Sequence, residues 1–267
     1  MRSAILISLF LPTVLLAQPV LDTIPELQGM GVDEHYGARL PLSLPLVNDE
    51  GDTVSLGDYF SGGKPVLMSL YYSDCPMLCS LVLTGLGAAV KQVGLKAGGD
   101  YRILSVSINP AESVEQSRAG RERFQAGLPA GSATEAWRFF SADSAVIKAL
   151  ADTVGFRYYR VEETGEFAHP AVVFVLTPEG RISRYLYGIE YAARDLKLAL
   201  VEAGEGKVGT TVDKIILYCY HYDPEAKGYT LMAANVMKLG GGLTVLGLGL
   251  LLGGLRLRER YGKQVSK

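Results

Sequence analysis

Two cysteines stand close together in the sequence, and their type and spacing suit thiol or metal chemistry. Cys75 and Cys79 are four residues apart, so on a helix their side chains would lie one turn apart on the same face. Pro76 suits the first position of such a helix and would place Cys75 at or next to its N-cap. There the free N–H groups and the helix dipole favour a thiolate, the form that binds metals or attacks disulfides.

A metal site built on this pair needs a further donor. Two thiolates are soft ligands that select Cu(I) over harder ions, whereas a closed structural zinc site normally has four protein ligands. The chain offers three histidines, His35, His169 and His221. His169 precedes a predicted strand, in a loop expected at the same end of the predicted sheet as the start of the cysteine helix. By placement, His169 is therefore the best candidate for the third donor beside Cys75 and Cys79.

Other interpretations of these residues stay open. Cys75 and Cys79 could form a structural disulfide, since a one-turn spacing lies within the Cα separation that such a bond allows. They could also be a redox-active pair in thiol:disulfide exchange, which needs no histidine. A peroxidase of the same fold would want an arginine beside its reactive cysteine, and no such pattern accompanies Cys75. His169 could be only a polar loop residue next to Pro170.

The surrounding segments predict an α/β domain. The cysteines lie where a strand-like run, residues 64–72, changes to the helical spacing of residues 76–93. His169 lies just before a predicted hairpin of residues 171–187. The other predicted elements are an N-terminal β-hairpin within residues 40–56, strands at 101–108 and 137–140, and helices at 111–125, 144–153 and 190–203.

Both ends of the chain carry uncharged stretches, residues 3–17 and 239–255, that do not fit a soluble core. Residues 1–17 predict a secretory signal peptide, with an uncleaved anchor as the alternative. Residues 238–256 are about long enough for a transmembrane helix, with a buried glycine-rich hairpin as the alternative. The basic tail of residues 257–267 should stay in the cytoplasm. The main domain is then expected on the periplasmic side of a bacterial membrane.

Length and charge complete this organisation. A chain of 267 residues fits one core domain with appendages, here residues 40–205 between a leader of residues 18–39 and a juxtamembrane segment of residues 206–237. The formal net charge of -2 provides no basic surface, so no nucleic-acid partner is expected.

The cysteine segment closely resembles that of the Sco (SenC, PrrC) family in the run Tyr71-Tyr72-Ser73-Asp74-Cys75-Pro76-Met77-Leu78-Cys79. The resemblance continues through residues 105–110 and the His169 loop, and covers roughly residues 40–203. It implies a thioredoxin-like fold and copper held by the cysteine pair and the histidine. It also implies delivery of that copper to the binuclear copper centre of cytochrome c oxidase.

Three features depart from the family pattern. Ser80 stands where proline usually follows the second cysteine, and Asn109 stands where aspartate usually precedes Pro110. Serine in a helix should do little harm, whereas Asn109 removes an acidic group that could serve partner docking or proton handling. The predicted anchor is C-terminal, while better-known members have an N-terminal membrane helix.

Two functions follow as hypotheses. The first is a membrane-anchored copper metallochaperone that holds Cu(I), with Cu(II) left open, and serves the copper-binding subunit of the oxidase. The second is a thiol:disulfide oxidoreductase that reduces the cysteines of that subunit or of another exported partner. A thioredoxin-like reductant would then reduce its own disulfide again. Three residues between the cysteines, where thioredoxin-type redox sites have two, favour the metal.

A second cysteine and histidine lie between the domain and the predicted membrane helix. Cys219 and His221 would point to one side of an extended strand, so a second metal or redox contact could form there. A semi-buried thiol is the simpler interpretation, because free cysteine often behaves as a small hydrophobe. His35 is expected to be a solvated residue of the leader.

Overall fold

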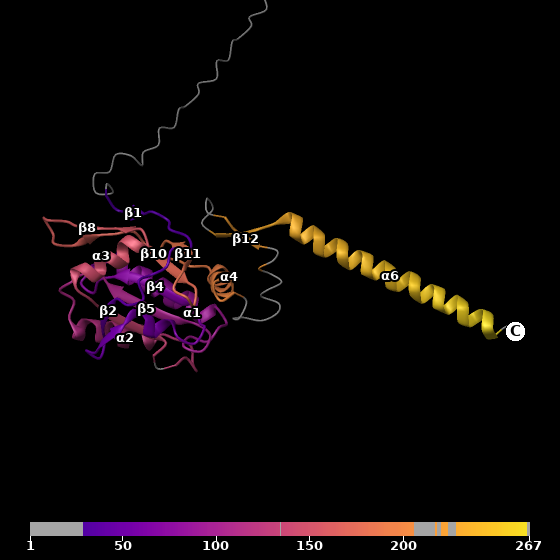
Figure 1. Cartoon of the computed structure of the whole chain (residues 1–267), viewed down its shortest axis with the longest axis horizontal. Coiled ribbons are helices and arrows are strands. Elements are labelled where there is room, and N and C mark those ends of the chain that lie inside the picture. The colour runs from indigo at the N-terminus through magenta and orange to yellow at the C-terminus, as the bar shows by residue number, and fades with distance from the viewer. Residues whose placement is uncertain (1–28, 134, 206–216, 218–219, 224–227, 266–267) are drawn as a thin grey trace, which may run out of the picture.

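The computed structural model describes residues 29–133, 135–205, 217, 220–223 and 228–265, and Figure 1 shows how their elements are arranged. The central sheet has seven strands, which are β2 (Pro45–Asn48), β3 (Thr53–Ser55), β4 (Val66–Tyr71), β5 (Arg102–Ser107), β6 (Trp137–Ser141), β10 (Val172–Leu176) and β11 (Ile182–Tyr187). In the described residues, the domain has the α-helices α1 (Leu78–Gln92), α2 (Val114–Gln125), α3 (Ser144–Thr153) and α4 (Ala193–Ala203), and the 3-10 helix η3 (Leu56–Phe60). The strand order is β11-β10-β4-β5-β6-β2-β3, with β4, β5 and β6 parallel and the other pairs antiparallel.

Helices cover both faces of this sheet, because side chains alternate between the faces along each strand. On one face, α1 and α2 pack over Trp137, whose indole lies 5.4 Å from the Phe124 ring of α2 between centroids. On the other face, the Tyr185 hydroxyl donates to Val154 O at the end of α3. α4 contacts α1 and β11. The predicted α/β, thioredoxin-like plan is confirmed.

β2 and β3 form the predicted N-terminal hairpin and extend the sheet beyond β6. Asn48 builds its turn, since the side-chain oxygen accepts the backbone N–H groups of Glu50 and Asp52. Gly51 has a φ of 94°, a left-handed conformation that glycine adopts without steric cost. The turn signal in the sequence therefore acts through ordinary turn chemistry.

Residues 29–39 pack on the domain, although the sequence placed them in a separate leader. β1 (Gly31–Val32) pairs with β7 (Phe156–Arg157), and Asp33 N–H donates to Gly155 O over 2.8 Å. A Cβ on Gly155 would lie 1.7 Å from Asp33 O, so this approach requires glycine. Two-residue strands are too short to leave a periodic signal in the sequence, which is why the contact was not predicted.

A hairpin and a long helix form the C-terminal part of the described chain. β12 (Tyr220–Asp223) pairs with β13 (Gly228–Leu231), and α6 (Ala233–Val265) begins after a single further residue. Tyr229 of β13 is buried, and its hydroxyl donates to Glu202 Oε2 of α4 over 2.5 Å. The segment before α6 is thus attached to the domain.

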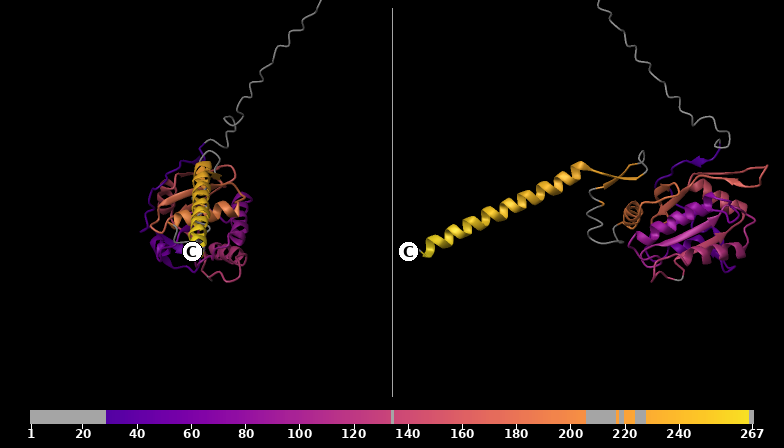
Figure 2. Two further views of the ribbon diagram at one scale, coloured as in Figure 1. Left: turned by 90° about the vertical axis from the view of Figure 1, so that its right-hand side faces the viewer. Right: turned by 180° about the vertical axis from the view of Figure 1, so that it is seen from behind.

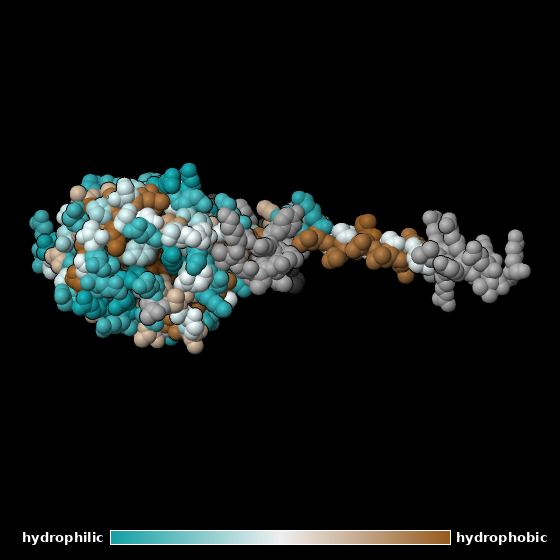
Figure 3. All heavy atoms as spheres, turned by 60° about the horizontal axis from the view of Figure 1, so that its bottom comes forward, coloured by the Kyte–Doolittle hydropathy of each residue, from teal (hydrophilic) through white to brown (hydrophobic). Residues whose placement is uncertain are grey.

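By length and composition, α6 is suited to cross a membrane. The segment Met237–Gly254 is 18 residues long and rich in apolar residues, and none of it is buried inside the structure. Eighteen residues rise ~27 Å, close to the ~30 Å hydrocarbon core of a bilayer. Figure 2 shows α6 extending away from the domain, and Figure 3 shows its hydrophobic surface. The predicted signal peptide of residues 1–17 lies outside the described residues.

Candidate metal centre

The two cysteines approach each other from different local structures. Cys79 lies in the first turn of α1, whereas Cys75 lies in the loop before the helix. Met77 is the N-cap, so the prediction that Pro76 opens the helix is wrong by two residues. The cause is a turn at the end of the preceding loop, where Cys75 N–H bonds back to Tyr72 O over 3.4 Å and delays the helical conformation.

Cys75 nevertheless reaches the helix N-terminus through its sulfur. The Cys79 N–H donates to Cys75 Sγ over 3.2 Å, and the Met77 N–H is bonded to the same sulfur. N–H groups in the first turn have no acceptor within the helix. A thiolate satisfies them and is stabilised by the helix dipole. The helix N-terminus therefore favours a thiolate on Cys75 as predicted, although Cys75 lies in the loop before the helix and only its sulfur reaches the free N–H groups.

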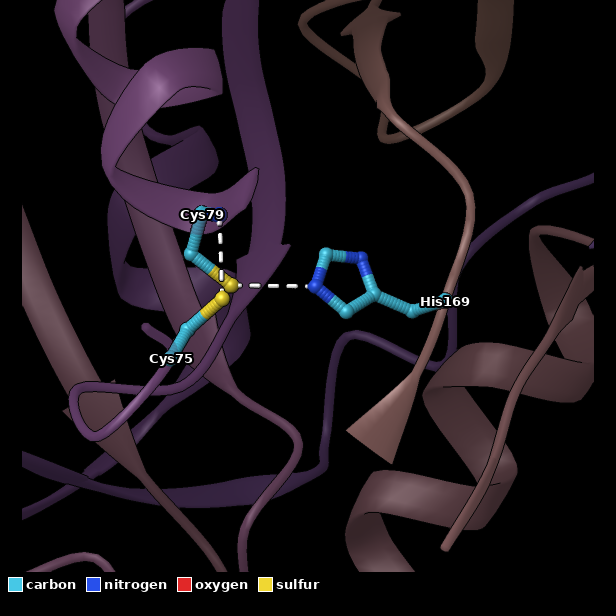
Figure 4. A group of neighbouring side chains, drawn as sticks. All are labelled: Cys75, Cys79 and His169. Carbon is cyan, nitrogen blue, oxygen red and sulfur yellow. Dashed lines mark hydrogen bonds between the residues drawn. The ribbon is translucent and has the colours of Figure 1, made fainter. Parts of the chain in front are cut away.

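His169 lies beside the cysteine pair, as Figure 4 shows. Its Nε2 is 3.0 Å from Cys79 Sγ, and the two sulfurs and this nitrogen all lie within 4.8 Å of one another. Cys79 and His169 are each 3% exposed, while Cys75 is half-buried. The group therefore opens to solvent on the Cys75 side. Neither cysteine is bonded in a disulfide.

Aromatic rings and a backbone carbonyl hold the imidazole in place. His169 follows β9 (Phe167–Ala168), and its Nδ1 is 3.1 Å from Pro170 O. An N–H donated there leaves the Nε2 lone pair facing the sulfurs. The ring of Tyr72 packs edge-on against the imidazole at 5.9 Å between centroids, and that of Phe156 lies 6.0 Å away. These protein contacts orient the His169 imidazole without the help of a bound metal.

The two thiols have opposite acidities because they share a hydrogen bond. Donation from the Cys79 thiol, together with the backbone N–H groups of Cys79 and Met77, lowers the pKa of Cys75 to about 3. The same hydrogen bond and burial raise the pKa of Cys79 above its ordinary range. At neutral pH the pair therefore consists of one thiolate, on Cys75, and one thiol.

A buried carboxylate near the cysteines was missed by the sequence analysis. Glu112 is 7% exposed and accepts hydrogen bonds from the N–H and hydroxyl of Ser73, and from the Ser107 hydroxyl over 3.0 Å. Ser73 belongs to the loop that leads to Cys75, and the charge of Glu112 contributes to the raised pKa of Cys79. Because β4 and β5 are parallel neighbours, the residues that follow each of them meet at one edge of the sheet. Applied to the residues after β5, this rule could have found Glu112.

Asn109 has a local role in the turn that follows β5. Its side-chain oxygen accepts the Ala111 N–H over 3.0 Å, and its own N–H donates to Ser107 Oγ over 3.1 Å. Asparagine performs this turn as well as aspartate does. The substitution therefore leaves the backbone beside Glu112 intact.

The donor set fits a soft metal ion. Two cysteine sulfurs and one imidazole match Cu(I), and no further Cys, His, Asp or Glu of the described residues joins them to complete a closed zinc site. Cys219 lies outside the described residues, and His221 pairs with Thr230 through β12 and β13. The second contact of Cys219 and His221 therefore stays a prediction. His35 is exposed, with Nδ1 bonded to the backbone of α3.

Comparison with known families decides where this arrangement belongs. The family model described as SCO1/SenC matches residues 36–197, more than half of the chain. The chain belongs to the SCO1/SenC family. The matched region of this Sco protein contains both cysteines, the histidine and Glu112. The family resemblance read from the cysteine motif is confirmed.

Solved structures share the fold of this Sco domain. A protein of Aquifex aeolicus VF5 is 26% identical, with a TM-score of 0.56 over 63% of this chain and 94% of its own. Arabidopsis thaliana ScoI with copper bound is 20% identical, with a TM-score of 0.50 over 63% and 98%. BsSco, described as a member of the Sco family of cytochrome c oxidase assembly proteins, is 19% identical, with a TM-score of 0.50 over 66% and 99%. No curated protein matches the sequence.

Proposed function

We propose that this Sco protein is a copper metallochaperone that binds Cu(I) through Cys75, Cys79 and His169. The observation that carries the proposal is the approach of two sulfurs and one imidazole nitrogen to within 4.8 Å. These donors are the soft kind that Cu(I) prefers. One sulfur is already a thiolate and the imidazole nitrogen is already oriented, so loading requires little rearrangement. Copper is the cargo of this site, and the half-buried Cys75 provides its open side.

The client in this proposal is the copper-binding subunit of cytochrome c oxidase, whose binuclear copper site would receive the metal. Family membership supports this choice, because BsSco is described as belonging to a family of oxidase assembly proteins. ScoI of A. thaliana has been solved with copper bound, which supports copper as the cargo. The ligand set of two sulfurs favours Cu(I), and binding of Cu(II) is a separate question for the titration below.

The proposal includes a single membrane anchor at the C-terminus. The apolar window Met237–Gly254 supports a membrane-spanning α6, and the basic residues 257–267 support a cytoplasmic C-terminus. The Sco domain would then lie on the periplasmic side, after removal of residues 1–17. A membrane-bound client and an anchored chaperone would encounter each other by diffusion within the plane of the same membrane. The packing of residues 29–39 supports a domain that begins before Leu40.

A thiol:disulfide oxidoreductase is the alternative, and the acidity of Cys75 favours it. A half-buried cysteine with a pKa of about 3 is a thiolate at neutral pH and can attack a partner disulfide. Cys79 would resolve the mixed disulfide, which releases the reduced partner and leaves a Cys75–Cys79 disulfide. A thioredoxin-like reductant would then restore both thiols. This cycle needs neither His169 nor a metal.

Cu(I) titration separates these functions. The full chain, purified in detergent micelles and reduced without oxygen, is titrated with Cu(I) against bathocuproine disulfonate as a competing chelator. We expect one copper per chain, lost in Cys75→Ala and Cys79→Ala and weakened in His169→Ala. The matched controls Cys219→Ala and His35→Ala, which alter the third cysteine and an exposed histidine, should bind copper like the wild type.

The opposite result is equally informative. A wild-type chain that binds no copper, reduces a disulfide-bonded peptide, and behaves identically after His169→Ala would reject the chaperone in favour of the oxidoreductase. Loss of copper in Cys219→Ala would instead move the site to the segment before α6.

A further inference from the structure

Met77 has a large apolar side chain that is neither buried in the core nor hydrogen-bonded as a cap of helix α1. It is 67% exposed, more than any other large apolar residue between β1 and α4. It occupies the N-cap of α1 and makes no side-chain capping bond there. Serine, threonine, aspartate and asparagine are preferred at this position because their oxygens accept the free N–H groups of the first turn. Neither burial nor helix stability therefore explains a methionine here.

The position of Met77 connects it with the metal centre. It lies between Cys75 and Cys79 in the loop that enters α1, and its backbone N–H is hydrogen-bonded to Cys75 Sγ. Cys75 is the half-buried donor, whereas Cys79 and His169 are enclosed. The exposed side chain of Met77 therefore starts at the rim where the group opens to solvent. Methionine is unbranched and flexible, so its sulfur can move from solvent to this opening.

We propose that the Met77 thioether is an auxiliary Cu(I) donor at the open side of the site, which holds the metal while it enters or leaves. The proposal rests on the Cu(I) site described above. A thioether is a soft, neutral ligand suited to Cu(I). As copper departs, the bond to His169 Nε2 breaks and a bond to Met77 Sδ forms. The imidazole leaves as the neutral base, so no proton is transferred and copper keeps its oxidation state.

Other exposed apolar residues of α1 and its surroundings suggest a different explanation, which the experiment must exclude. Leu81, one turn further along α1, is 40% exposed, and Ile189 near the same helix is 38% exposed. Together they could make Met77 part of a hydrophobic contact with a partner. Met77→Leu keeps the apolar volume and removes only the sulfur, so it distinguishes a metal donor from a packing surface. Met77→Ser removes the sulfur and restores a preferred cap.

X-ray absorption on selenomethionine-labelled protein tests the contact directly. The full chain in detergent carries His169→Ala, which removes the third donor, and is loaded with Cu(I). We expect a selenium neighbour at bonding distance from copper, lost when Met77→Leu is added. It should persist when the control Met237→Leu is added instead, since Met237 is an exposed methionine of α6, 76% exposed. Copper bound without a selenium neighbour would overturn the Met77 proposal and leave the Cu(I) site standing.

Release kinetics test the same proposal without altering a primary ligand. Bathocuproine disulfonate removes Cu(I) from the loaded full chain, and the rate is followed by the colour of the copper–chelator complex. Met77→Leu and Met77→Ser should each release copper severalfold more slowly than the wild type, while Met237→Leu should match it. Equal or faster release from both Met77 variants would contradict the proposal. A wild-type chain that takes up no Cu(I) would overturn both this inference and the chaperone function.

Discussion

Two buried carboxylates of this domain are stabilised in opposite ways. Asp49, which is fully buried, lies beside arginine, with Oδ1 2.9 Å from Arg138 Nη2 and 3.6 Å from Arg121 Nε. Glu112, beside the metal centre, is held in the described part of the chain by hydroxyl and N–H groups of Ser73 and by the Ser107 hydroxyl. One negative charge is neutralised at the edge of the sheet, and the other is solvated by neutral dipoles.

This difference separates stability from function. The pair of Asp49 with Arg138 has no cysteine or histidine of the metal centre among its partners, so its charges serve the fold. Glu112 lies near Cys79, and its carboxylate contributes to the raised pKa of that thiol. A negative potential at this end of the sheet also attracts a monovalent cation such as Cu(I). We therefore expect the Asp49 region to dominate unfolding and the Glu112 region to dominate thiol and metal chemistry.

The largest effect on stability is expected for Asp49→Ala. It leaves Arg138, whose side chain is 3% exposed, without its buried counter-charge, which should cost about 3 kcal/mol of unfolding free energy. Glu50 keeps a more exposed contact to Arg138 and limits the loss. Urea unfolding of the full chain in detergent, followed by the fluorescence of Trp137, the single tryptophan, measures this change. The exposed Asp52→Ala in the same hairpin is the control, and equal effects of both variants would contradict the assignment.

Glu112→Gln should lower stability less and change the cysteines more. The amide keeps one acceptor for the Ser73 loop, so we expect a loss of about 1 kcal/mol. Removal of the negative charge should lower the pKa of Cys79, because that charge opposes its ionisation. Thiolate absorbance near 240 nm, recorded against pH, measures the shift. If Asp49→Asn moves this titration as far as Glu112→Gln does, the contrast between the two carboxylates fails.

The pH dependence of the metal-free protein gives a third, smaller effect, since Cys75 is half-buried and partly screened by solvent. Its folded pKa of about 3 lies below the ordinary value of 9.0, so its contribution to stability is fully present above pH 9 and is lost as pH falls towards 3. Cys79 is shifted upward, so its contribution is present below pH 9 and lost above it.

The stability of the reduced, metal-free chain should therefore pass through a maximum near pH 9. Urea midpoints measured from pH 4 to pH 10 test this profile, and Cys75→Ser should remove the slope on the acid side. Iodoacetamide should alkylate Cys75 already at pH 5 and spare Cys79, as mass spectrometry of the peptides would show. Alkylation of both cysteines with one common pH profile would refute the hydrogen bond by which the Cys79 thiol stabilises the Cys75 thiolate.

Much of the fold could be predicted because its signals are local. β4 and β10 are buried along their whole length and appear in the sequence as apolar runs, broken in β4 by Ser69, and adjacent residues form the turn at Asn48. The cysteine pair was predicted from its spacing, and His169 was predicted from its place before a strand together with the family resemblance.

What escaped prediction depends on contacts between distant segments or on an unusual cap. Glu112 meets Ser73 across 39 positions of sequence, and β1 pairs with β7 through only two residues. The start of α1 was misplaced because the chain first makes a turn from Tyr72 to Cys75, after which the Cys75 sulfur accepts free N–H groups, a role that sequence rules give to Ser, Thr, Asp or Asn. Such departures from local rules are expected at functional sites.

The smallest effect is expected for Tyr72→Phe, in the region of Glu112 and the metal centre. The Tyr72 hydroxyl accepts the Phe167 N–H over 3.3 Å, and its ring packs edge-on against His169. Loss of the hydroxyl leaves one N–H without this partner and should cost about 0.5–1 kcal/mol of unfolding free energy, while the ring contact stays. Because Phe167 lies two residues before His169, Cu(I) affinity should fall slightly as well.

A matched tyrosine makes this last prediction decisive. The Tyr191 hydroxyl also bonds to the backbone, at Gly188 O over 2.6 Å, but belongs to the loop before α4. Tyr191→Phe should lower the unfolding free energy by a similar amount and leave Cu(I) affinity unchanged, because its hydrogen bond does not orient a donor. Equal losses of affinity in both variants would mean that the His169 loop responds to the stability of the whole domain and not to its contact with Tyr72.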